Sequence, residues 1–160
     1  MTSASSPPSS VDSTRRKLLA AGASLGAVVM VRPVFAAPDE LAAAIDAYTG
    51  GAKVNSGRVD FDIAKLVDNG NTVPVTVTVD SPMLAANHVS AIAIFNERNP
   101  QRDVARFTLG PRAGKASVST RIRLATSQKL VAIAKLSDGT YWSQTVNVVV
   151  TLASCIEGES

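Results

Sequence analysis

The thiol of Cys155 is the most reactive nucleophile that the sequence offers. Cys155 is the only cysteine among 160 residues, and it lies in the last segment, Ala-Ser-Cys-Ile-Glu-Gly-Glu-Ser, residues 153–160. A single cysteine cannot form a disulfide within its own chain, and exported domains that use cysteine structurally carry an even number. The position predicts an accessible thiol for covalent attachment or intermolecular pairing. The alternative is an inert thiol, since free cysteine is usually buried.

Other side chains that could perform catalysis are few and scattered. His88 is the single histidine, and it follows Ser81-Pro82 in a predicted loop. His88 could be a catalytic base or a metal ligand. We expect a solvated loop residue instead, because no second histidine or cysteine lies near it to complete a set of metal ligands. The chain has no glycine loop of the kind that cradles phosphates. We therefore expect no catalytic residue, no metal site and no cofactor.

Arginines are concentrated between Arg98 and Arg123. Arg121 and Arg123 alternate with apolar residues, so both would lie on one face of a strand. They either line a docking surface or are ordinary solvent-facing residues of a half-exposed strand. Trp142 is the only tryptophan. We expect it to be buried in the core, and an interface anchor is the alternative.

The first 36 residues have the layout of a secretory signal. The pair Arg15-Arg16 precedes a moderately apolar run over residues 18–31 and resembles the start of a twin-arginine signal. The run is shorter than the roughly 20 residues that a membrane-spanning helix needs, and an uncleaved anchor is the alternative. Small residues predict cleavage after Ala36. Because the twin-arginine route carries folded proteins, we expect a periplasmic protein that folds before export and leaves the membrane after processing.

The distribution of charge gives no reason to expect a nucleic acid as a partner. Four of the 16 basic residues and one of the 13 acidic residues lie within residues 1–36, which leaves 12 of each sign in residues 37–160. The basic pI of about 9.3 therefore belongs to the targeting segment, and it gives no argument for nucleic-acid binding. The remaining chain is long enough for one domain with a core. We expect that domain over residues 37–152, followed by a flexible tail over residues 153–160.

The elements that must position these groups follow from periodicity. Pro38-Asp39-Glu40 predicts the start of a short helix and Gly50-Gly51 its end. Period-two alternation and apolar runs predict strands at residues 59–63, 73–79, 89–95, 104–109, 116–124, 130–136 and 141–152. Pro74 places its strand at a sheet edge or a bulge. Asp138-Gly139 predicts a two-residue hairpin turn of the primed type.

About seven short strands separated by turns predict an all-β fold. We expect an immunoglobulin-like antiparallel β-sandwich with a short N-terminal helix. The inter-sheet disulfide usual in that fold is absent, because the chain has one cysteine. Packing alone must then hold the two sheets together.

Several segments carry a resemblance to a known family. The most specific are Asn-Gly-Asn-Thr-Val-Pro-Val at residues 69–75 and Thr-Arg-Ile-Arg-Leu-Ala at residues 120–125. The twin-arginine start, Ala-Tyr-Thr-Gly-Gly at residues 47–51, Phe-Thr-Leu-Gly-Pro at residues 107–111 and the Val-rich last strand add to them. In these segments the chain resembles SoxY, the sulfur-carrier subunit of the periplasmic thiosulfate-oxidising system, with a variant C-terminal tail.

The resemblance implies a periplasmic carrier, not an enzyme, that holds sulfur intermediates on a tail cysteine aligned with Cys155. It implies a heterodimer with a SoxZ-like β-sandwich subunit. It also implies three partner enzymes: a haem protein that conjugates thiosulfate to the cysteine, a hydrolase that releases sulfate, and a sulfane dehydrogenase.

The tail departs from the family pattern, which is Gly-Gly-Cys-Gly-Gly. Here Ala153-Ser154 precede the cysteine and Ile156-Glu157 follow it. β-branched Ile156 stiffens the tail, and nearby anions disfavour the nucleophilic thiolate. A non-carrying assembly or regulatory paralogue is therefore the alternative function. Thiol-based metal delivery is a third, which one cysteine and one distant histidine support poorly.

Overall fold

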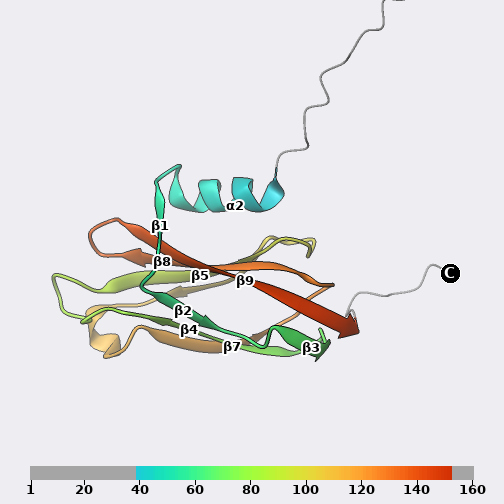
Figure 1. Ribbon diagram of the computed structural model, residues 1–160. Coiled ribbons are helices and arrows are strands. Elements are labelled where there is room, and N and C mark those ends of the chain that lie inside the picture. Colours follow the sequence, from blue (N-terminus) through green and yellow to red (C-terminus); the bar gives the residue numbers. More distant parts are fainter. Residues whose placement is uncertain (1–38, 153–160) are drawn as a thin grey trace, which may run out of the picture. The chain divides into compact units, whose positions relative to one another are not determined.

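Two stacked sheets and one outer helix make up residues 39–152, the part of the chain that the computed structural model describes (Figure 1). The larger sheet has the order β1-β9-β8-β5-β6, with β3 also paired to β9, and the smaller sheet has the order β2-β4-β7. The elements are α2 (Glu40–Thr49), β1 (Val54–Ser56), β2 (Val59–Asp62), β3 (Leu66–Asn69), β4 (Val73–Val79), β5 (Val89–Asn96), β6 (Asp103–Thr108), the 3-10 helix η1 (Pro111–Ala113), β7 (Ser117–Ile122), β8 (Gln128–Leu136) and β9 (Tyr141–Leu152). The predicted all-β sandwich with one short helix is confirmed.

Helix α2 forms where its capping residues predict it. The Asp39 carboxylate accepts a hydrogen bond of 3.0 Å from the Leu41 N–H, which satisfies one of the unpaired donors of the first turn. The helix ends at Gly50, whose φ of 66° lies in the left-handed region that favours glycine. No helix within the described residues is long and apolar enough to cross a membrane.

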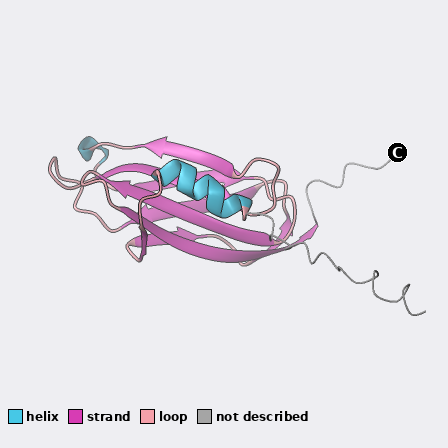
Figure 2. Ribbon diagram, turned by 90° about the horizontal axis from the view of Figure 1, so that it is seen from above, coloured by secondary structure: helices cyan, strands magenta, loops and turns pink. Residues whose placement is uncertain are grey.

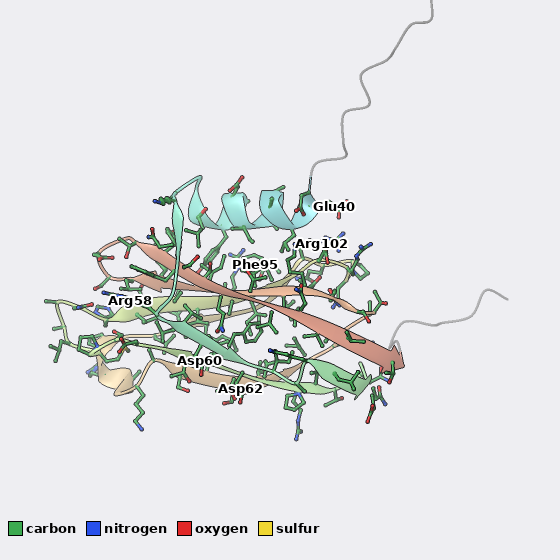
Figure 3. The ribbon with its side chains drawn as sticks, in the orientation of Figure 1. Glu40, Arg58, Asp60, Asp62, Phe95 and Arg102 are labelled. Carbon is green, nitrogen blue, oxygen red and sulfur yellow. The ribbon has the colours of Figure 1, made fainter. Side chains whose placement is uncertain are left out.

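One face of α2 covers the outer side of the larger sheet. Figure 2, from above, shows the helix lying over the strands. Leu41 of the helix joins a buried cluster with Phe95, Ile133 and other residues of β5, β8 and β9. The Tyr48 ring packs 5.4 Å from the Phe95 ring, and burial raises the pKa of the Tyr48 hydroxyl. An ion pair between Arg102 and Glu40 fixes the start of the helix (Figure 3).

The main core lies between the two sheets. Strand β4 alternates strictly, and its inward valines at 73, 75, 77 and 79 are all buried. They pack against the inward side chains of the larger sheet, which include Ile92, Ile94 and Leu130. Full burial of one such side chain contributes about 1.5–3 kcal/mol. The outer face of the smaller sheet carries exposed polar residues, among them Asp60 and Asp62 (Figure 3).

The prediction that Pro74 marks an edge strand or a bulge is wrong, because β4 is the middle strand of the smaller sheet and pairs with β7 through Pro74↔Arg121 without a register shift. Strand β2 pairs only with residues 76–79 of β4, whereas β7 pairs with residues 73–78. The Val79 N–H donates to Ala116 O, so the odd-numbered residues bond toward β7 and the even-numbered ones toward β2. The missing N–H of Pro74 thus faces a position that β2 does not reach.

Two strands were not predicted, and both are short. Strand β1 pairs in parallel with Tyr141–Ser143 of β9, and β3 pairs in parallel with the last residues of the same strand. Between them the chain crosses to the smaller sheet as β2. Segments of three or four residues are too short to show a period. Their pairing comes from the neighbouring edge of β9 rather than from their own sequence.

The hairpin between β8 and β9 also differs from its prediction. The Leu136 N–H donates to Thr140 O and the Gly139 N–H donates to Leu136 O, so three residues form the loop. Of these, Gly139 alone has positive φ, at 85°. Such a loop is a turn followed by a left-handed glycine, the next most common hairpin after the primed two-residue turns.

Gly70 allows the turn after β3 to approach the segment that follows β7. A Cβ atom at Gly70 would lie 2.3 Å from the Leu124 carbonyl oxygen and 3.2 Å from a methyl group of Val150. The Leu124 N–H in turn donates to Gly70 O at 2.8 Å. Because the contact at 2.3 Å is with backbone, no side-chain rotation can relieve it.

Gly70→Ala should therefore lower the free energy of unfolding by about 1–3 kcal/mol, the usual cost of overpacking a tight site. Urea denaturation followed by circular dichroism measures this. Gly110→Ala is the matched control, since nothing lies within 4 Å of its Cβ position and its φ is −140°. Equal midpoints for the two variants would contradict a close packing at Gly70.

Candidate functional site

The thiol that the sequence singles out, Cys155, lies outside the described residues, and so do Arg15 and Arg16. The described groups closest to Cys155 in sequence are at the end of β9. The candidate site is therefore the end of the sandwich from which residues 153–160 leave, together with the polar surface beside it.

Strand β9 is held on one side up to its last residue and on the other side up to Val150. On one side, β3 pairs with it from Leu66↔Val149 to Asn69↔Leu152. On the other side, the Val150 N–H donates to Ser127 Oγ at 2.9 Å. The Thr151 hydroxyl donates to Asp68 O at 3.1 Å. Leu152, three residues before Cys155, is therefore a fixed point of the fold.

The turn after β3 connects this point to the arginines of β7. The Asn71 N–H donates to Asn69 Oδ1 at 2.9 Å, a local bond that stabilises the turn. Asn71 Oδ1 then accepts a hydrogen bond of 3.2 Å from Arg123 Nη2. Arg123 therefore contacts directly the turn that follows the last β3–β9 residue pair.

Asn99 holds the loop between β5 and β6 against the segment that follows β7. Its side-chain amide donates to Arg123 O at 2.7 Å. Its Oδ1 accepts from the Ala125 N–H at 2.9 Å and from Gln128 Nε2 at 2.8 Å. Its own N–H donates to Oδ1 of the buried Asn96 at 3.0 Å. These four bonds fix the backbone on which Arg123 is carried.

A groove of about 530 Å³ opens beside these residues, between the edges of β6 and β7. Apolar side chains of Val104, Ala105 and Ile122 line it, and Arg121 and Arg123 are the cations among its lining residues. Both arginines are exposed. Asp103, which also lines the groove, is paired with Arg106 at 2.5 Å. The predicted strand ends earlier than expected, at Ile122, so Arg121 is in β7 and Arg123 lies just past its end. Both arginines line the groove.

The remaining candidate residues are placed apart from this site. His88 precedes β5, its N–H donates to Ser137 Oγ at 3.2 Å, and its Nδ1 lies 3.2 Å from Leu84 O. Trp142 is only half-buried, which corrects the expectation of full burial. Its Nε1–H donates to Thr140 Oγ1 at 3.2 Å and the Arg58 guanidinium lies 4.8 Å from its ring centre, so a polar environment keeps it at the surface.

Within residues 39–152, no three His, Cys, Asp or Glu side chains are grouped so that they could hold a metal ion. Sequence reasoning missed Asn99 and Gly70 as organisers of this end of the sandwich. The signal for Gly70 was present in Asp-Asn-Gly-Asn, which indicated only a turn. No pattern indicates Asn99, because its bonds join segments that are 24 to 29 residues apart.

Comparison with protein families gives one match. Residues 45–155 match the family described as sulfur oxidation protein SoxY. No curated protein matches the chain significantly.

Solved structures share the architecture. The sulfur carrier protein SoxY from Chlorobium limicola f thiosulfatophilum is 29% identical, with a TM-score of 0.61, and the match covers 72% of this chain and 100% of that one. A superoxide reductase (neelaredoxin) from Ignicoccus hospitalis is 17% identical, with a TM-score of 0.54, covering 61% and 94%. One from Nanoarchaeum equitans is 14% identical, with a TM-score of 0.52, covering 60% and 100%. The reductases show a common fold and nothing more.

Asn99→Ala should lower the free energy of unfolding by about 1–3 kcal/mol, because it leaves partly buried partners without their hydrogen bonds. Asn99→Asp keeps the acceptor and loses the donor to Arg123 O, so it should cost less. Asn147→Ala, at an exposed position of β9, is the control and should change stability by no more than about 0.5 kcal/mol. Urea midpoints rank the three variants, and an Asn99→Ala midpoint equal to that of the control would contradict the role of Asn99.

Proposed function

This chain belongs to the SoxY family of sulfur oxidation proteins, a family of sulfur carriers, and we propose that it carries sulfur covalently on Cys155. One observation carries the proposal. The family match does not stop with the sandwich at Leu152 but continues to residue 155, which is the only cysteine of the chain. A carrier needs a reactive atom at the end of an arm and a folded body behind it.

The described residues support the division between body and arm. Strand β9 is hydrogen-bonded to β8 and β3, so the last three residues before the tail belong to a stable sheet. Three residues of extended chain span at most about 10 Å. Cys155 therefore stays within reach of the surface at this end of the sandwich while its thiol can enter the active site of another protein.

The proposed reaction is a two-electron oxidation. The Cys155 thiol loses its proton, its sulfur forms a bond to the outer sulfur of thiosulfate, and two electrons pass to a haem protein. Hydrolysis of the product by a second enzyme then releases sulfate and two protons and leaves a persulfide on Cys155. A sulfane dehydrogenase can oxidise that persulfide further. In this scheme the chain binds and presents the intermediates, and its partners catalyse each step.

Partnership with other Sox proteins follows from the family, and we propose a SoxZ-like subunit as the stable partner. The free edge of β6 supports a dimer, because an unpaired strand edge is open to another chain and benefits from cover. We also propose that residues 1–36 direct the folded protein, with its partner, to the periplasm.

The flanks of Cys155 favour one alternative. Ile156 and Glu157 replace the glycines of the family pattern, and a chain that no longer carries sulfur could keep the sandwich as an assembly or regulatory subunit. The loading experiment below distinguishes the two functions.

With thiosulfate and the haem-protein oxidant present, Cys155 should gain a thiosulfonate adduct, detected by mass spectrometry of the intact protein. Cys155→Ser should abolish the adduct and leave the urea midpoint unchanged. Ile156→Gly with Glu157→Gly should speed loading, and the part of the gain due to charge should shrink at high salt. A glycine-tailed carrier serves as the positive control. If it loads while Cys155 stays unmodified, this chain is not a carrier.

Replacing Arg15 and Arg16 by lysine should retain the protein in the cytoplasm, together with the SoxZ-like partner. Cell fractionation followed by immunoblotting measures both subunits. Lys17→Gln is the control, because it removes one positive charge and keeps the arginine pair. Normal export of the partner with the double variant would contradict joint export.

A further inference from the structure

We propose that the acidic tail, residues 153–160, docks in extended form in the groove between β6 and β7, with Glu157 beside Arg123 and Glu159 beside Arg121. Docking gives Cys155 a resting position on the body of the domain. This position would regulate access to Cys155 in the proposed carrier function, so the regulatory role rests on that function. The docking of the tail does not depend on it.

The receiving surface is a groove between the edges of the two sheets, and it carries two cations. Among the described strands, β7 pairs only with β4 and β6 pairs only with β5. The groove between them has apolar side chains of Val104 and Ile122 below the exposed Arg121 and Arg123. Arg121 is in β7 and Arg123 lies one residue past the end of that strand, and two extended residues separate them by about 7 Å.

These arginines have no carboxylate partner among the described residues, although other arginines nearby do. Arg102 pairs with Glu40, and Arg106 pairs with Asp103, the acid that lines the groove. Asp62, on the outer face of the same sheet, lies opposite Thr76 of β4, and Thr76 in turn pairs with Ser119. Asp62 is thus two strands away from β7 and in a different row from Arg121.

The tail complements this surface in spacing as well as in sign. Glu157 and Glu159 are also two residues apart, so in an extended chain they lie on one side with the same separation of about 7 Å. Ile156 then points to the opposite side, where the groove is apolar. No basic residue occurs in residues 153–160. Opposite charges that face each other across the groove attract and favour docking.

The tail starts at the correct end of the sandwich and is long enough. Leu152 pairs with Asn69, and Arg123 contacts Asn71 in the turn that follows. The groove edge is three strands from β9 in the larger sheet, about 14 Å away. Five extended residues from Leu152 to Glu157 span up to about 17 Å. The chain therefore reaches Arg123 first and Arg121 next, which makes the tail antiparallel to β7.

Docking changes the chemical environment of Cys155. In an extended tail Cys155 lies on the same side as Glu157, so it faces the arginine side of the groove edge. The guanidinium groups neutralise the glutamates that otherwise disfavour the thiolate. The docked tail must leave the groove before Cys155 enters a partner's active site, and salt weakens the two exposed ion pairs that oppose release.

The single cysteine allows a direct test with one nitroxide spin label on Cys155 of the purified protein. Paramagnetic broadening of backbone amide signals should be strong for Thr120–Arg123 and weak at Gly114 and Lys115, near the other end of β7. Arg121→Gln with Arg123→Gln should reduce the docked population roughly fivefold, as expected for two exposed ion pairs. Glu157→Gln with Glu159→Gln, or about 0.5 M salt, should act in the same way.

Lys115→Gln is the matched control, since it removes an exposed cation of the same surface outside the proposed contact. Broadening at Thr120–Arg123 that is absent, or that persists unchanged in both charge variants, overturns the proposal. A mixture of isotope-labelled and spin-labelled molecules separates intramolecular docking from the tail of a second copy, and broadening in that mixture overturns it too. If the tail docks but Cys155 gains no sulfur adduct in the loading experiment, the docking proposal stands and the carrier function is rejected.

Discussion

Apolar packing between the two sheets is the interaction on which everything else in this domain depends. The chain has one cysteine and so cannot link its own sheets covalently. The four inward valines of β4 meet Ile92, Ile94 and Leu130 of the larger sheet instead. Such packing is sensitive to volume, because protein interiors are dense and single methylene changes matter. A hydrogen bond from the Phe61 N–H of β2 to Gln144 Oε1 of β9 also joins the two sheets.

Packing leaves the strand edges and the ends of the sandwich to polar contacts. At the end where β9 terminates, the hydrogen bonds of Asn71 and Asn99 join three separate segments: the turn after β3, the loop between β5 and β6, and the segment that follows β7. Asparagine suits this task because its amide both donates and accepts. The result is an end of the molecule with an ordered backbone and exposed guanidinium groups. The rigid part of the fold thereby presents charge next to the origin of the tail.

Periodicity in the sequence was sufficient for the long elements. Strand β4 alternates cleanly, β5 and β8 are apolar runs, and the caps Asp39 and Gly50 mark the helix. It was insufficient where pairing depends on a distant partner, as for β1 and β3 on β9. Pro74 shows why a local rule failed. The rule is that proline cannot donate a backbone hydrogen bond to a neighbouring strand. Whether position 74 needs that bond depends on how far β2 extends, and the sequence of β4 does not encode the length of β2.

For the candidate site the balance is similar. Residue type and family resemblance identified Cys155, and alternation predicted Arg121 and Arg123 as neighbours on one face. Their relation to the groove required the fold, because β6 and β7 are brought together only by the stacking of the two sheets. Residues 153–160 lie beyond the described part of the chain, so no contact of Cys155 itself enters this comparison.

The pairing of β9 has a mechanical consequence. In the proposed carrier function, a partner that draws the tail into its active site exerts tension on the end of β9. The hydrogen bonds to β8 run across the axis of β9, over eight residue pairs from Gln128↔Val148 to Lys135↔Tyr141. Tension along that axis loads them together in shear rather than one at a time as in peeling, and the parallel β3 shares the load. The domain can therefore resist tension on its C-terminal tail without losing the pairing of β9 to β8 and β3.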